Sequence, residues 1–132
     1  MAEANQRGWT TVGDTLTWLK LGIQSSCERW GVPSASAASF AASATLGSNP
    51  METIAMAKWT DMFLQGYEAW TEWRRLDFPV LSPPAAAITG TGVPVRNGYG
   101  GLVPTQNAAS YNAAVSAQGP DNQDTKLWWD TK

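Results

Sequence analysis

The sequence contains no histidine and only one cysteine, Cys27, among its 132 residues. Without histidine, the chain lacks both the commonest general base at neutral pH and the commonest metal ligand of proteins. A single cysteine excludes an internal disulfide and a zinc site built from several thiolates. We therefore expect a protein that is not an enzyme, with no catalytic residue, no bound metal and no cofactor.

Charged residues are also scarce. They make up 15% of the chain, and the net charge is only −2, whereas about a quarter of a typical globular chain is charged. Such a balance provides no basic surface for nucleic acid, so no nucleic-acid partner is expected. No apolar run reaches the roughly 18 residues of a transmembrane helix. Residues 1–5 also lack the basic start and apolar stretch of a secretory leader, so we expect no leader in this chain.

The first periodic segment predicts a helix over about residues 11–30. Its apolar residues recur every three or four positions, which places them on one helical face: Val12, Leu16, Leu19, Ile23, Cys27 and Trp30. Gly31 and Pro33 then end the pattern. On this face Cys27 is expected to be a small buried hydrophobe. Residues 34–48 are rich in Ser and Ala without a clear stripe, and they favour a loop or a short helical turn.

The second periodic segment predicts one helix over about residues 50–76. Asn49 is a typical N-cap, and Pro50 suits the first helical position. Two apolar stripes follow, Ala55-Trp59-Met62-Gly66-Ala69-Trp73-Leu76 and Met56-Phe63-Tyr67-Trp70, beside one polar stripe, Lys58-Asp61-Gln65-Glu68-Glu72-Arg75. At 1.5 Å per residue this helix would be roughly 40 Å long. Two apolar stripes against one polar stripe indicate a helix mostly surrounded by protein.

Residues 77–132 are predicted to form an irregular tail, because glycines and prolines interrupt the chain every few residues. Only residues 106–116 favour a short helix. The tail nevertheless contains aromatic residues, in which disordered segments are poor: Phe78, Tyr99, Tyr111, Trp128 and Trp129. We therefore expect the tail to wrap over a protein body larger than these 132 residues.

The segment from Trp59 to Pro79 resembles the C-terminal helix of the SusD/RagB-like glycan-binding lipoproteins. The residues that match this family signature are Trp59, Glu68, Ala69, Trp70, Glu72, Arg74, Arg75 and Pro79. Four further segments are similar to the family in the same order: residues 22–32, residues 93–99 with Arg96 and Tyr99, residues 107–114, and residues 127–130. The resemblance thus covers nearly the whole chain.

This resemblance implies a mostly α-helical fold with tetratricopeptide-like helix pairs: two long helices, followed here by the irregular tail. It also implies a lipoprotein on the extracellular face of the Bacteroidetes outer membrane, which works with a TonB-dependent transporter in polysaccharide utilisation. The ligand would be an oligosaccharide or a peptide. Residues 1–132 would be the C-terminal portion of a single SusD-like domain, without its leader and lipidated cysteine, and with the remainder of that protein as a partner. The alternative is a helical-repeat module that binds proteins and no glycan.

Tyr99, Trp128 and Trp129 are the candidate ligand-binding residues, because they lie in irregular segments, where binding residues are disproportionately found. Packing against other protein is the alternative for all three. Helical spacing on an apolar face instead predicts a core position for Trp59, Trp70 and Trp73.

The charged residues of the signature are expected to be structural. Glu68 and Glu72 lie on one stripe that we expect to face solvent, whereas the two carboxylates of a glycosidase flank the bond that is cleaved. Arg75 is expected to pair with Glu72, three positions away. Arg74 falls off this stripe, and a structural role in the last helical turn is predicted for it.

Overall fold

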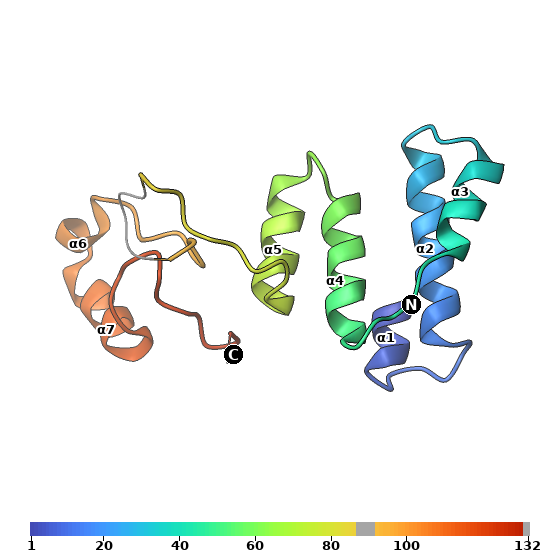
Figure 1. Cartoon of the computed structure of the whole chain (residues 1–132). Coiled ribbons are helices and arrows are strands. Elements are labelled where there is room, and N and C mark those ends of the chain that lie inside the picture. The colour runs from blue at the N-terminus through green and yellow to red at the C-terminus, as the bar shows by residue number, and fades with distance from the viewer. Residues whose placement is uncertain (87–91, 131–132) are drawn as a thin grey trace. The chain divides into compact units, whose positions relative to one another are not determined.

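The computed structural model describes residues 1–86 and 92–130 (Figure 1), and in these ranges it contains seven helices and no strand. The expectation of a mostly α-helical fold is therefore confirmed. The chain divides into two compact units, Met1–Pro79 and Val80–Lys132, and each is described by itself below. Residues 87–91 and 131–132 of the predicted irregular tail lie outside the described residues.

Five helices form the first unit: α1 (Ala2–Gln6), α2 (Thr15–Arg29), α3 (Ser34–Ala42), α4 (Pro50–Asp61) and α5 (Gly66–Leu76). They are arranged as two helical pairs, α2 with α3 and α4 with α5, as Figure 1 shows. The short helix α1 contacts both α2 and α4. Helix α1 thereby connects the two pairs.

Helix α2 begins four residues later than predicted. The Asp14 carboxylate caps it by accepting the backbone N–H of Thr17 at 3.0 Å, which satisfies a donor that has no partner within the helix. Gly13, just before the cap, has a φ of 72°, a left-handed conformation that does not continue a helix. The helix ends at Arg29, and Gly31 follows with a φ of 86°, in agreement with the predicted stop.

Residues 34–42 form a regular helix, although the sequence favoured a loop or a short turn. Ala37 and Ala41, one turn apart on α3, are both buried. Small side chains at these positions let α3 approach α2 closely, so packing rather than an apolar stripe stabilises this helix.

The single helix predicted over residues 50–76 is wrong, because the chain turns back at residues 62–65 and forms two helices. Leu64 has a φ of 69°, and the N–H of Gln65 donates to the Met62 carbonyl at 2.8 Å. Both predicted ends are confirmed. Asn49 accepts the Glu52 N–H at 3.3 Å, and α5 ends at Leu76.

Few apolar side chains are buried in the first unit, and half of them are alanines: Leu19, Ala37, Ala41, Ile54, Ala55 and Leu76. The three tryptophans predicted for the core, Trp59, Trp70 and Trp73, are only half-buried. Several large apolar side chains of the predicted stripes are exposed, most of all Tyr67 at 82%. The described residues of this unit thus leave much of the predicted buried surface open.

The second unit contains α6 (Val103–Gln106) and α7 (Ala108–Gln118), which pack against each other. Helix α7 confirms the helix expected over residues 106–116, displaced by two residues. A hydrogen bond of 2.8 Å from the Val95 N–H to the Gln123 carbonyl joins the segments on either side of these helices. None of the helices in the described ranges has the length and apolar character needed to cross a membrane.

Candidate functional site

The three aromatic residues predicted to bind ligand lie in irregular segments of the second unit, and they differ in exposure. The Trp128 side chain is 87% exposed, whereas Tyr99 and Trp129 are exposed by 39% and 37%. The C-terminal segment is held in a turn by the N–H of Asp130, which donates to the Leu127 carbonyl at 2.9 Å. Trp128 is therefore the most accessible of the three rings.

Tyr99 is held by contacts on three sides. Its backbone N–H donates to the Asp121 carboxylate at 3.1 Å, and the Gln118 amide donates to its hydroxyl oxygen at 2.9 Å. Its ring meets Tyr111 edge-on, with the ring centroids 5.7 Å apart and the planes at 78°, an arrangement that aromatic pairs prefer. These contacts hold both the backbone and the phenol of Tyr99.

The support beneath Tyr99 is a buried ion pair between Arg96 and Asp121. The Arg96 guanidinium lies 3.3 Å from the Asp121 carboxylate, and the two side chains are only 6% and 12% exposed. A Cβ at Gly98 would lie 3.3 Å from the same carboxylate, so a larger residue there would press on it. Desolvation and the negative charge of Asp121 raise the pKa of Tyr111. Arg96 was noted in the sequence as part of a family segment, but nothing in the sequence indicated Asp121 as its partner.

The described side chains around Tyr99 and in the C-terminal turn are mainly aromatic and amide groups. An exposed indole is a flat apolar face with a polar N–H at its edge, which suits the C–H faces of a sugar ring. The Tyr99 hydroxyl and the Gln118 amide are hydrogen-bonding groups of the same unit. In the described part of the chain, no group of three or more Cys, Asp or Glu side chains is placed to hold a metal ion.

The charged residues of the family signature form a network within the first unit. Arg75 donates to both Glu72, at 2.7 Å, and Glu3 of α1, at 2.6 Å, which confirms the predicted pair of Arg75 and Glu72. Lys58 of α4 binds the same two carboxylates. Hydrogen bonds from Arg75, Arg7 and Lys58 outweigh desolvation and hold the pKa of Glu3 far below its usual range.

Glu72 corrects one prediction about this signature. It was expected on a solvent-facing stripe, but its side chain is only 21% exposed and binds two cations. Glu68 is exposed as predicted. The reason for the difference is the reversal at residues 62–65, which turns the Glu72 side of α5 toward Lys58 on α4.

The other signature residues lie around the end of α5. The Arg74 guanidinium is buried and lies 4.4 Å from the centre of the Trp70 ring, a cation–π contact. The Trp73 indole N–H donates to the Pro79 carbonyl at 3.0 Å, so it fastens the segment that follows the helix. A structural role for Arg74 in the last turn of α5 stays a prediction.

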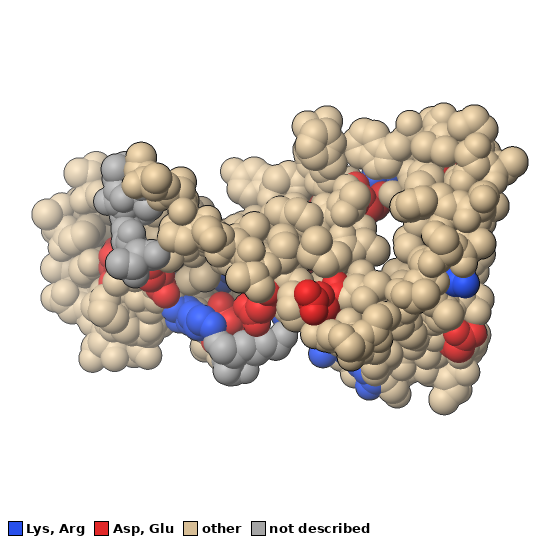
Figure 2. Space-filling model, viewed as in Figure 1, with Lys and Arg blue, Asp and Glu red and all other residues tan. Residues whose placement is uncertain are grey.

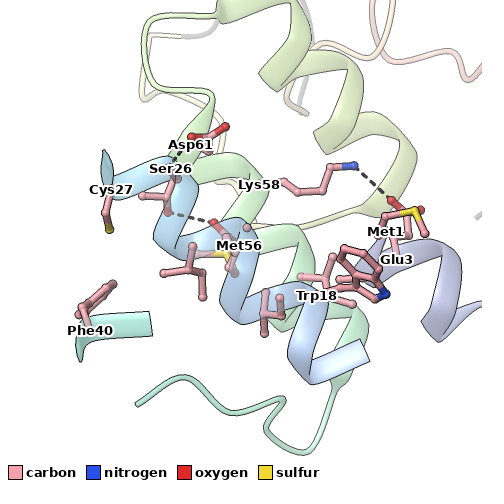
Figure 3. Close-up of a pocket in the computed structure, with 16 residues that line it drawn as sticks. Met1, Glu3, Trp18, Ser26, Cys27, Phe40, Met56, Lys58 and Asp61 are labelled. Atoms are coloured by element: carbon pink, nitrogen blue, oxygen red, sulfur yellow. Dashed lines mark hydrogen bonds and ion pairs between the residues drawn. The ribbon is translucent and has the colours of Figure 1, made fainter. Parts of the chain in front are cut away.

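A pocket of about 520 Å³ opens in the first unit (Figure 3), and no pattern in the sequence indicated it. Helices α2 and α4 supply most of its lining, with contributions from α1 and from Phe40 of α3. Its apolar lining residues include Leu19, Ile23, Phe40, Ile54, Met56 and Ala57. Cys27 also lines it and is half-buried, so the buried position expected for this cysteine is wrong.

Comparison with known proteins identifies the family of the chain. The model of a SusD-like family, described as starch-binding and associating with the outer membrane, matches residues 1–100. The chain belongs to this family. No curated protein matches it.

Solved structures agree with this assignment. A chitin-binding protein is 28% identical over 99% of the SusD-like chain, with a TM-score of 0.84. A SusD-like protein of Bacteroidetes and a chitin-binding SusD homologue from Flavobacterium johnsoniae are each 25% identical over 99% of the chain, with TM-scores of 0.84 and 0.77. The matches cover 31%, 28% and 34% of these three structures. The SusD-like chain therefore spans about a third of the length of its structural relatives.

Proposed function

We propose that residues 1–132 are the C-terminal portion of a single SusD-like domain, in a protein that captures oligosaccharides at the outer surface of a bacterium without cleaving them. The observation that carries this proposal is the family match over residues 1–100, together with two chitin-binding relatives that share the fold over 99% of the chain. The protein would be a lipoprotein of the outer membrane, and it would deliver its ligand to a TonB-dependent transporter.

The second unit supports binding rather than catalysis. Trp128 offers an open aromatic face, and the hydroxyl of the fixed residue Tyr99 lies beside the Gln118 amide. Ordering side chains at a binding site costs free energy, so groups that are already fixed bind more tightly. In the first unit, Glu72 is occupied by two cations, which leaves it unsuited to the acid–base chemistry of a glycosidase.

The proposal is tested by calorimetric titration of the protein encoded by the complete reading frame that contains residues 1–132. The titrants are oligomers of N-acetylglucosamine and of glucose, with the monosaccharides as controls for chain length. We expect saturable binding of at least one oligomer and an unchanged product pattern after long incubation. Failure of every oligomer to bind, or capture of a protein partner other than a TonB-dependent transporter, would favour the helical-repeat alternative.

A further inference from the structure

The pocket in the first unit lies between two helical pairs that meet incompletely. Helix α2 packs along α3, and α4 along α5, whereas α2 and α4 touch at few points. The space-filling view shows an opening between these elements, on a face where charged residues are sparse (Figure 2). The described residues thus leave a gap where a mostly helical protein would be expected to be close-packed.

The lining of this pocket is mostly apolar, and part of it is open to solvent. The side chains of Phe40 and Met56 are 64% and 39% exposed. Large apolar side chains gathered around one cavity mark an interaction site rather than the scattered exposure normal for a surface. An apolar occupant would remove these side chains from water, which is worth about 25 cal/mol per Å².

The charged groups at the rim are already paired, which argues against a polar ligand. Lys58 lies 3.1 Å from Glu3, and Ser26 donates to Asp61. Asp61 is held further by Arg29, which donates to its backbone carbonyl at 2.7 Å. Figure 3 shows Lys58 directed toward Glu3 and Asp61 directed toward Ser26. A saccharide needs hydrogen-bonding groups that are free to receive it, so this rim favours an apolar occupant.

Gly22 indicates how closely the occupant approaches. It lies in the middle of α2 and lines the pocket, although glycine inside a helix costs roughly 0.5–1 kcal/mol relative to alanine. A Cβ added at Gly22 would meet no atom within 4 Å, so nothing among the described residues requires a glycine. Glycine is the usual choice where another backbone must come close.

We propose that the pocket seats an apolar helical segment of the same polypeptide, lying outside residues 1–132, with its side chains inserted between α2 and α4. This inference rests on the proposed function in one respect, namely that the chain is part of a longer SusD-like protein. The matched structures, of which this chain covers 28% to 34%, contain ample further chain to supply such a segment, and the fold they share is mostly helical.

Cys27 provides a direct probe, because it is the only cysteine of the sequence and it lines the pocket. The rate of its reaction with a maleimide is measured at neutral pH in the 132-residue chain and in the complete protein, with any further cysteines of the latter replaced by serine. We expect labelling at least about tenfold slower in the complete protein, because the seated segment must leave before the thiol reacts. Equal rates would overturn the proposal, as would a reading frame that supplies no further segment.

A pair of substitutions tests the close approach at Gly22. The Cβ of Gly22→Leu would meet no atom within 4 Å in the 132-residue chain, and leucine favours a helix over glycine, so the substitution should leave the midpoint of thermal unfolding of that chain unchanged or raised. In the complete protein it should lower the midpoint by several degrees, because the leucine occupies the space of the seated segment. Gly66→Leu is the matched control, since Gly66 also has no neighbour within 4 Å but lies outside the pocket. The same response to both substitutions in the complete protein would contradict the inference.

Two further outcomes would identify a different occupant and reject this one. Protection of Cys27 that disappears on dilution of the complete protein would indicate a second copy of the chain. Protection that is lost after unfolding, extraction with organic solvent and refolding would indicate a small apolar molecule. Saccharide titration remains an independent readout, so glycan capture and the seated segment can fail separately.

Discussion

Lys58 on α4 reaches Glu72 on α5 across a helical hairpin, although 14 positions separate them in the sequence. Glu72 also binds Arg75 on its own helix, and both cations share Glu3 of α1. Three helices are thereby joined by two carboxylates and two cations. The family signature around Glu72 thus acts in this unit as a connection between helices.

Glu72→Gln is expected to destabilise the first unit. The network side chains retain 13% to 35% exposure, so solvent screening keeps the expected loss to about 1 kcal/mol. Glu68→Gln is the matched control, because Glu68 is exposed on the same helix, and it should change stability by less than about 0.5 kcal/mol. Urea unfolding followed by circular dichroism measures both. Equal losses would show that the network contributes nothing specific.

The network also predicts a loss of stability in acid. Hydrogen bonds, chiefly from Arg75, lower the pKa of Glu3 from its ordinary value of 4.5. Burial alone would raise the pKa of Glu72, but hydrogen bonds from Arg75 and Lys58 lower it overall. The stabilisation is therefore complete above about pH 4.5 and is lost as the pH falls through the lower folded-state values, since the unfolded chain then binds more protons.

We accordingly expect the urea midpoint to be lower at about pH 3 than at about pH 6. The double variant Glu3→Gln/Glu72→Gln removes both carboxylates and should show a smaller difference between the two conditions. A difference as large as that of the unsubstituted chain would mean that other groups govern the acid response.

The turn before α2 predicts different effects of alanine at two glycines. Gly13 and Gly8 both have a φ of 72°, so alanine is strained at either position by about 1 kcal/mol. Only at Gly13 would the new Cβ lie 2.7 Å from the Trp18 indole nitrogen, which itself donates to the Val12 carbonyl. Gly13→Ala should thus cost about 1 kcal/mol more than Gly8→Ala. Thermal unfolding of the two variants measures the difference, and equal costs would rule out the Trp18 contact as its cause.

The helical periodicity of the sequence predicted which segments are helical better than it predicted where a helix is interrupted. The polar stripe containing Lys58 and Glu72 fits a single continuous helix, and the same residues also face each other in the hairpin that forms. The break depends on Leu64 adopting a left-handed conformation, which leucine rarely does, so no local signal marked it. Helix α3 was not predicted for a related reason. Its stability comes from the packing of alanines against α2, which leaves no apolar stripe in the sequence.

The candidate site was predictable only in part. Tyr99 and Trp128 stood out as aromatic residues in irregular segments, and the family segment pointed to Arg96. Asp121, the partner of Arg96, follows 25 positions later. This separation depends on the path of the chain through α6 and α7, so no sequence periodicity indicates it. The pocket was not predictable at all, since it requires two helical pairs where the sequence suggested two long helices.

The buried ion pair beneath Tyr99 predicts a large effect of Asp121→Ala. Removing the carboxylate leaves the guanidinium of Arg96 buried and unpaired, at an expected cost of about 3 kcal/mol. Asp121→Asn keeps an acceptor for the Tyr99 N–H and should cost less. Near-ultraviolet circular dichroism reports the loss of the fixed Tyr99 environment. Identical spectra and stabilities for the two variants would show that the pair does not support Tyr99.

Saccharide capture by the aromatic residues of the second unit is tested most directly at Trp128. An oligosaccharide to which the complete protein binds is titrated into the Trp128→Ala variant of that protein. Trp9→Ala is the control, because Trp9 is also largely exposed, at 70%, but lies in the first unit. We predict that Trp128→Ala weakens binding about tenfold, as expected when an aromatic contact is removed, and that Trp9→Ala leaves the affinity unchanged. Equal affinities for all three proteins would contradict a role for Trp128 in capture.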